Sequence, residues 1–253
     1  MKEEWKKVKL GELCEITSSK RFHLSERTTS GIPFYCTKEI LLKLKGEENF
    51  ECDYIAEKFY EEIKTKFGVP ESGDLLLTTR GTVGYPYLYR KTDKFYFADG
   101  NLSWFKNFSE KLDSHFLYYW FLSVDGKSKV DSIAKGTAQK AVPITGLGIL
   151  DITLPSLPTQ QKIASILSAY DDLIENNRKQ IKLLEEAAQK LYKEWFVKLN
   201  FPGHETTKIA DGVPDGWKKE KIDIVFDIKY GKNLPTTEIQ KSGKYPVYGA
   251  NGI

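Results

Sequence analysis

The sequence lacks the motifs that mark a catalytic subunit. Its 253 residues contain no GxxxxGK[ST] phosphate-binding loop, and no Asn-Pro-Pro-Tyr or Asp-Pro-Pro-Tyr run of the kind that amino-methyltransferases carry. Gly81-Thr82-Val83-Gly84 is not a dinucleotide fingerprint, because we expect it to join two strands and to open no helix. Glu62-Ile63-Lys64 fits a charged helix face better than a nuclease site. We therefore predict no catalytic residue.

Cysteine and histidine are scarce. The chain has only three cysteines, Cys14, Cys36 and Cys52. Their odd number and the absence of a CxxC spacing favour reduced thiols in a cytoplasmic protein over a disulfide framework. The three histidines lie far apart with no ligand-like spacing, so we predict no metal site. We expect His115, in an aromatic stretch, to be a packed side chain.

Long apolar runs and a strong charge of one sign are also missing. No run approaches the roughly 18 apolar residues of a membrane span, and the N-terminus shows no signal segment. The formal net charge of +3 is weakly basic, so a nucleic-acid surface would have to come from local clustering. With 40% hydrophobic and 13% aromatic residues, we predict a folded cytoplasmic protein that makes no membrane contact.

The most informative stretch present is a long helical pattern. Residues 159–197 contain no Gly and no Pro, and apolar residues recur in alternating steps of four and three. This heptad seam consists of Ile163, Leu167, Tyr170, Ile174, Asn177, Ile181, Leu184, Ala188, Leu191 and Trp195. Such a seam predicts a coiled-coil-type helix about 58 Å long, with Thr159 as a plausible cap. Asn177 is the kind of polar seam residue that fixes register.

A seam this narrow predicts a partner helix. The alternative is a helix packed on its own domain, but such helices usually carry a wider apolar stripe. We favour a spacer arm that pairs with a like helix.

The residues before this helix predict an α/β (α+β) domain. We expect a strand or helical turn within 5–16, a polar loop at 17–21, and a buried strand followed by a loop within 32–40. Further strands are predicted at 74–79, 85–89, 95–98, 102–105 and 150–154. Helices are predicted at 56–64 and 113–124, a polar stretch at 127–140 and a stiff linker at 155–158. Alternating or clustered aromatic residues such as Tyr87 and Trp120 favour core packing over base stacking.

The C-terminal part repeats the N-terminal part. EEWKKVKLGELCEI at the start is echoed by DGWKKEKIDIVFDI at 215–228, an offset of 212 residues, and SGIPFYC at 30–36 is echoed by SGKYPVYGA at 242–250. Duplication explains this better than chance. The second copy stops at Ile253, too short to rebuild such a domain. We expect this tail to be partly ordered on something else or a relic.

A domain, a long helix and the start of the same domain again resemble the specificity subunit of type I restriction–modification systems. GDLLLTTRGTVG (73–84) resembles a strand-and-loop motif of that family, and DGVPDGWKKEKI (211–222) resembles the start of its second recognition domain. The more specific likeness is KGTAQKAVPITGLGILDITLPSLPTQQKIASIL (135–167), which is similar to the stretch that closes a recognition domain and opens the spacer helix.

The resemblance implies a target-recognition domain at 1–157, a spacer helix at 158–200, and a linker with an incomplete second recognition domain at 201–253. It implies a non-catalytic subunit that binds double-stranded DNA, modification (methyltransferase) subunits and a restriction (endonuclease/translocase) subunit. S-adenosylmethionine and ATP would belong to those partners. Family members usually carry two recognition domains and two helices, so we expect a half-length or truncated form that pairs its helix with a second copy's as a homodimer.

DNA reading is expected on polar loops at one end of the domain. The candidates offer Lys and Arg for phosphates and Gln for an adenine edge. They are Lys20, Arg21, Arg80, Thr82, Lys135, Thr137, Gln139 and Lys140. Each could equally be a solvated turn residue. Loops within motifs shared by the family favour backbone positioning, so base readers are expected at 20–26 or 37–45.

Two other functions stay open. The chain could be a decoy that binds modification or full-length specificity subunits without supporting activity, in which case it would co-purify with them without methylation. It could also be the recognition half of a fused methyltransferase or nuclease, although Met1 opening directly on a recognition motif argues against an N-terminal fusion.

Overall fold

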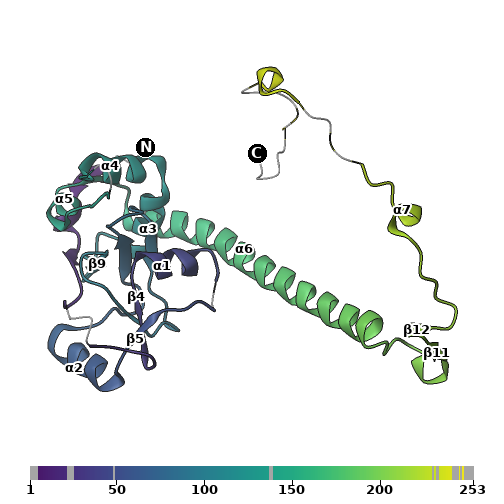
Figure 1. Cartoon of the computed structure of the whole chain (residues 1–253). Helices are drawn as coiled ribbons and strands as arrows, with labels where there is room; N and C mark the ends of the chain where they lie inside the picture. Colours follow the sequence, from purple (N-terminus) through teal and green to yellow (C-terminus); the bar gives the residue numbers. More distant parts are fainter. Residues whose placement is uncertain are drawn as a thin grey trace. The chain divides into compact units, whose positions relative to one another are not determined.

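The computed structural model describes residues 5–21, 26–47, 49–136, 139–229, 231, 234–240, 245 and 247. The chain divides into two compact units, Met1–Leu184 and Glu185–Ile253. The first unit contains a mixed α/β domain and most of the long helix α6, Leu157–Tyr192, which begins where the domain ends (Figure 1). The predicted fold class is therefore confirmed.

Two four-stranded sheets form the centre of the domain. One is antiparallel throughout and has the order β2 (Glu15–Thr17), β9 (Leu102–Lys106), β6 (Leu75–Thr78), β7 (Pro86–Leu88). The other has the order β3 (Arg27–Thr28), β5 (Asp53–Ile55), β4 (Ile32–Tyr35), β8 (Tyr96–Phe97), with β4 and β8 parallel. A separate ladder joins β1 (Lys6–Lys9) to β10 (Asp151–Leu154), so the first and last strands of the domain meet.

Strand β6 separates two cores. Leu75 and Leu77 pack in one hydrophobic cluster, whereas Leu76 packs in another, and all three are fully buried. This follows from the two-residue period of a strand, whose successive side chains point to opposite faces. Both faces of β6 are covered, which explains why the sequence reads there as a continuous apolar run rather than an alternating one.

The helices follow the sequence only in part. The predicted helices at 56–64 and 113–124 are present as α2 (Glu57–Phe67) and α3 (Ser114–Leu122). The prediction of a loop after β4 is wrong, because α1 (Thr37–Leu44) begins there. Glu39 accepts a hydrogen bond from the Cys36 N–H at 2.8 Å and caps this helix.

The polar stretch at 127–140 is a second correction. Its first half belongs to α4 (Val124–Ile133), which begins after Ser123, whose hydroxyl accepts from the Gly126 N–H at 3.1 Å. A short helix, α5 (Ile144–Gly148), precedes β10. Prediction also failed for His115, which is exposed. The buried aromatic residues Tyr87 and Trp120 do pack in the cores as expected.

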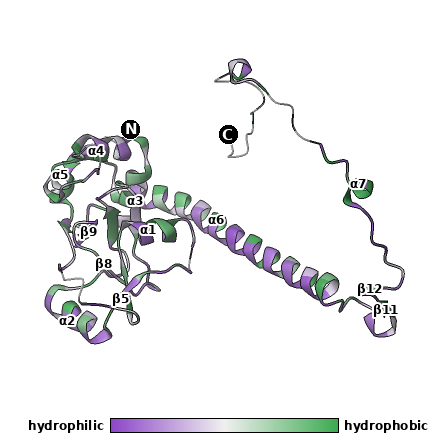
Figure 2. Ribbon diagram, in the orientation of Figure 1, coloured by the Kyte–Doolittle hydropathy of each residue, from purple (hydrophilic) through white to green (hydrophobic). Residues whose placement is uncertain are grey.

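Helix α6 begins at Leu157, two residues before the predicted cap Thr159. The Ser156 carbonyl accepts the first helical hydrogen bond, from the Gln160 N–H at 2.9 Å. The helix ends in a π-helical turn at Lys193–Val197, so the helical stretch reaches the predicted residue. Hydrophobic and hydrophilic residues alternate along its ribbon (Figure 2).

The second unit has little regular structure beyond the end of the helix. It contains the 3-10 turn His204–Thr206, the hairpin β11 (Ile209–Ala210) with β12 (Val213–Pro214), the helical turn α7 (Ile222–Val225) and the 3-10 turn Thr236–Glu238. Trp217 stacks between Phe196 and Phe201, with ring centroids 5.6 and 5.4 Å apart.

The repeat is visible in one turn of structure. Leu10–Glu12 forms a 3-10 turn, and α7 lies 212 residues later at the matching position. Leu10 is fully buried, but its counterpart Ile222 is 64% exposed. Lys218–Lys221, which match β1, form no strand in this part of the described chain. The second copy therefore keeps the local turn without the tertiary partners that bury the first.

Candidate nucleic-acid interface

Two of the predicted DNA-binding loops lie side by side. The Gly81 N–H donates to the Lys140 carbonyl at 2.9 Å, and Arg80 and Lys135 each form an antiparallel bridge with Ala141. Backbone hydrogen bonds thus bring Arg80 next to Lys135 and Lys140, although some 55 residues separate them in the sequence.

The turn between β8 and β9 connects these loops to the first predicted loop. The Asn101 carbonyl accepts from the Thr79 N–H at 2.8 Å, which fixes this turn against the 79–82 loop. The Ser18 hydroxyl donates to the Leu102 carbonyl at 3.2 Å and accepts from the Gly100 N–H at 3.3 Å. We call residues 18–21, 79–82, 99–101, 135–136 and 139–141 the polar loop cluster.

Helix α1 borders the cluster at its first residue. The Thr37 hydroxyl is within hydrogen-bonding distance of the Arg80 carbonyl, at 3.1 Å, and of the Asn101 carbonyl, at 3.3 Å. The region 37–45, predicted as a loop that carries base readers, is instead a helix whose N-terminal end joins the loops.

Glycine makes the tight turns of the cluster feasible. Gly136 has φ +91°, and a Cβ there would lie 2.6 Å from the Gln139 carbonyl oxygen. Gly81 has φ +75° with no atom within 4 Å of the position a Cβ would take. The side of Gly81 that a Cβ would occupy is therefore uncrowded, while its N–H is already bonded to the Lys140 carbonyl.

The cluster carries five cationic side chains. They are Lys20, Arg21, Arg80, Lys135 and Lys140. Arg21 is 87% exposed, with Nε 3.8 Å from an Asp99 carboxylate oxygen, and the Lys140 ammonium lies 3.2 Å from Asp131. Among the described residues, neither Arg80 nor Lys135 forms an ion pair. Thr82 and Gln139 are exposed beside them, whereas the predicted residue Thr137 lies outside the described residues.

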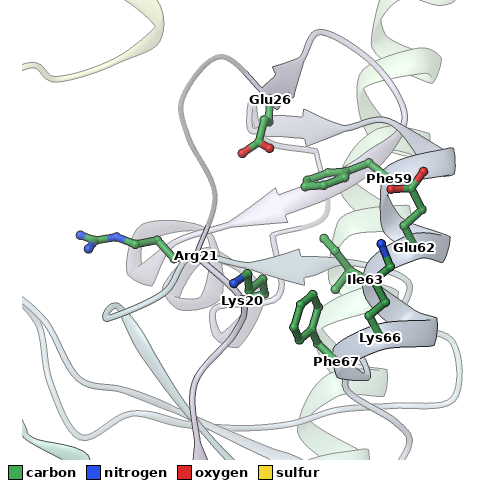
Figure 3. Close-up of a pocket in the computed structure, with 8 residues that line it drawn as sticks. All are labelled: Lys20, Arg21, Glu26, Phe59, Glu62, Ile63, Lys66 and Phe67. Atoms are coloured by element: carbon green, nitrogen blue, oxygen red, sulfur yellow. The ribbon is translucent and has the colours of Figure 1, made fainter.

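A pocket of about 140 Å³ adjoins the first loop of the cluster. Figure 3 shows its lining residues: Lys20, Arg21, Glu26, Phe59, Glu62, Ile63, Lys66 and Phe67. The Lys20 ammonium lies over the Phe67 ring, 4.9 Å from its centroid, and the Lys20 N–H donates to the Tyr96 hydroxyl at 2.8 Å. Burial raises the pKa of that hydroxyl, which keeps it protonated. Arg21 extends away from the pocket in the same view.

The sequence analysis does not predict that residues of α2 line this pocket. Tyr60, Ile63 and Phe67 fall at helical spacing, and a pattern of this kind predicts three buried residues. Tyr60 and Ile63 are buried, but Phe67 is 50% exposed. No local signal distinguishes it, because the residue that lies over its ring, Lys20, is distant in the sequence.

The predicted pairing seam of α6 is open to solvent over most of its length. Tyr170 is 64% exposed, Ile174 48% and Leu184 69%. Leu167, Ile181 and Leu191 are exposed as well, as is Asn177. Ile163 differs, because it packs against the core of its own domain, and Trp195 is half-buried.

No helix of the described chain has the length and hydrophobicity that crossing a bilayer requires. Nor do those residues contain a group of three or more His, Cys, Asp or Glu arranged to hold a metal ion.

Comparison with known proteins identifies the family. The profile described as "Type I restriction modification DNA specificity domain" matches residues 2–186. The chain belongs to this family. It is 28% identical over 249 residues to the type I restriction enzyme MjaIX specificity subunit of Methanocaldococcus jannaschii. This match covers 93% of this chain and 55% of that protein. A specificity subunit of Haemophilus influenzae is 27% identical over 74% of this chain and 46% of its own length.

Solved type I specificity subunits share the fold. The S subunit from M. genitalium superposes with a TM-score of 0.60 at 19% identity, over 98% of this chain and 60% of that one. The HsdS subunit from Thermoanaerobacter tengcongensis gives 0.50 at 19% identity, over 81% and 46%. The chain therefore spans about half the length of the specificity subunits that it matches.

Proposed function

We propose that this chain is a DNA sequence-recognition subunit of a type I restriction–modification complex. The α/β domain reads one half-site, and the polar loop cluster supplies the contacts. The observation that carries the proposal is that four loops distant in the sequence meet in one region of a domain of this family. These loops carry five cationic side chains. Phosphate contacts position such a protein, while exposed side chains such as Gln139 and Thr82 can reach base edges.

The long helix supports a homodimer within this proposal. An exposed apolar seam is costly in water, and two antiparallel copies would cover it. At about 1.5 Å per residue, the 36 residues of α6 extend about 54 Å, close to the rise of 16 base pairs. Two identical domains at opposite ends would then read a two-fold symmetric site with unread pairs between the half-sites.

Further exposed apolar residues on α6 suit the partner subunits. Ile166 and Leu173, which are 52% and 54% exposed, flank the pairing seam, whereas Leu183, which is 64% exposed, lies away from it. These residues would bind the modification subunits, which would bring the restriction subunit to the same DNA. We propose that the chain acts in the cytoplasm. We also propose that it binds neither S-adenosylmethionine nor ATP and catalyses no reaction itself.

Selection from a random duplex library with the purified chain tests the proposal. We expect a bipartite, two-fold symmetric sequence, with affinity that falls steeply as salt rises because phosphate contacts release counterions. Enrichment of no sequence would contradict DNA recognition by this chain. If the same chain captured modification subunits without supporting methylation, the decoy function would replace the proposal.

A further inference from the structure

Gln160 fastens the first turn of α6 to the domain. Its side chain is fully buried, and both the nitrogen and the oxygen of its side-chain amide form hydrogen bonds. The Nε2 group donates to the Lys111 carbonyl at 2.9 Å and to the Pro155 carbonyl at 3.0 Å, while Oε1 accepts from the Asp113 N–H at 3.0 Å. The segment that leads into α3 is thereby tied to the start of α6.

Two further contacts tie the same helix to the domain further along. The Tyr119 hydroxyl, on α3, donates to Asp171 at 2.8 Å, and the Arg90 guanidinium, after β7, lies 3.2 Å from Glu175. Hydrogen bonds from Lys179 and the charge and hydrogen bond of Arg90 hold the pKa of the Glu175 carboxyl below its usual range. At 100° per residue, Asp171 and Glu175 lie within about 60° of Gln160 around the helix.

These contacts restrict how the domain can turn on the helix. A contact at Gln160 alone would leave the domain free to swing about the start of α6. Asp171 and Glu175 lie about 16 and 22 Å further along the axis, so contacts there oppose that swing. A domain of this size has a radius of gyration of about 15 Å, so a rotation of about 13° would move atoms at that distance from its centre by about one base-pair rise.

We propose that Arg90, Tyr119 and Gln160 are positioning residues that fix the angle between the recognition domain and α6, and that this angle selects the number of base pairs between the two half-sites. This inference rests on the proposed function, since spacing has meaning only for a paired, DNA-reading subunit. Exposed contacts such as Tyr119 with Asp171 add little to stability, so their removal separates geometry from folding.

The test compares a double variant, Arg90→Met with Tyr119→Phe, with the control Lys179→Met. The control removes the ion pair of Lys179 with Glu175, at 2.8 Å, within the helix and leaves the domain contacts in place. Distances between spin labels at Lys58 on α2 and Lys182 on α6 report the angle without DNA. We expect a broader distance distribution for the double variant only, with an unchanged melting temperature for both.

Selection from a random duplex library then reports the spacing. The wild-type chain and the control should select a single spacing, and the double variant should spread over neighbouring lengths while keeping the same half-site sequence. An unchanged distance distribution in the double variant would overturn the proposed clamp. A broadened distribution with unchanged spacing would overturn its role in DNA reading. Failure of the wild-type chain to select DNA would refute the proposed function and the spacing role together, whereas the label distances would still decide the geometry.

Discussion

At the scale of single residues, Arg80 and Lys135 are the most direct candidates for DNA contact. Both are exposed, neither forms an ion pair among the described residues, and backbone bridges to Ala141 hold them together. Such cations are suited to phosphates, because no existing ion pair must break before they bind.

Replacing Arg80 or Lys135 with Ala should weaken DNA binding and lower the number of counterions released by about one for each phosphate that is no longer neutralised. The slope of log affinity against log salt concentration measures this effect. Lys91→Ala is the matched control, because Lys91 is also exposed but follows β7 at the end of the β6–β7 hairpin opposite to Gly81. If all three variants bound alike, the polar loop cluster would not be the interface.

Cys14 should be a reporter of core integrity. Burial raises the pKa of its thiol to about 12, so the reactive thiolate is almost absent at pH 8. In a Cys36→Ser, Cys52→Ser background, a thiol-specific reagent should label Cys14 only on the timescale of unfolding. Labelling that proceeds at the rate of a free thiol, without denaturant, would show that the core around Leu10 opens readily.

The candidate contact residues could be found from sequence, but their assembly could not. Glycine with arginine at 79–82, and glycine with lysine at 135–140, mark both stretches as polar loops. Their proximity depends on hydrogen bonds such as Gly81 to Lys140 and Thr79 to Asn101, which join residues far apart in the chain. Lys20, which lies over the Phe67 ring, is likewise distant in the sequence, and no helical period reveals this contact.

At the scale of elements, the sequence predicts best where its periodicity is strong. The predicted buried strand and long helix are present as β6 and α6, because β6 is a continuous apolar run and α6 keeps a heptad seam with Asn177 as its one polar member. The sequence analysis misses α4 because it is short and polar, and α1 because its eight residues are too few to show a helical period. Each depends on a cap, Glu39 or Ser123, rather than on a wide apolar face.

Helix α3 gives a test of such a cap. The Asp113 carboxylate accepts from the Phe116 N–H at 2.9 Å, so Asp113→Ala should lower the free energy of unfolding by about 1 kcal/mol. Denaturant titration measures the change. Asp113→Asn keeps the capping oxygen and should remain near wild type. Equal stability of the Ala variant would mean that the helix is held by Phe116 and Leu117 in the core alone.

At the scale of the whole molecule, α6 carries more exposed apolar residues than a helix on its own domain requires. The domain covers Gln160 and Ala164, which are buried, and leaves the seam from Leu167 to Leu191 in solvent. The specificity subunits that match are about twice as long as this chain. A second copy would supply a partner helix with the same seam.

Solution mass by light scattering tests this pairing most directly. The wild-type chain should have twice its 29.0 kDa monomer mass, and Ile174→Asp with Leu184→Asp should reduce it to the monomer. The control Ala169→Asp with Leu183→Asp places two charges at exposed positions away from the seam and should stay dimeric. A wild-type monomer at every concentration, or a seam variant that still dimerises, would contradict pairing through this helix.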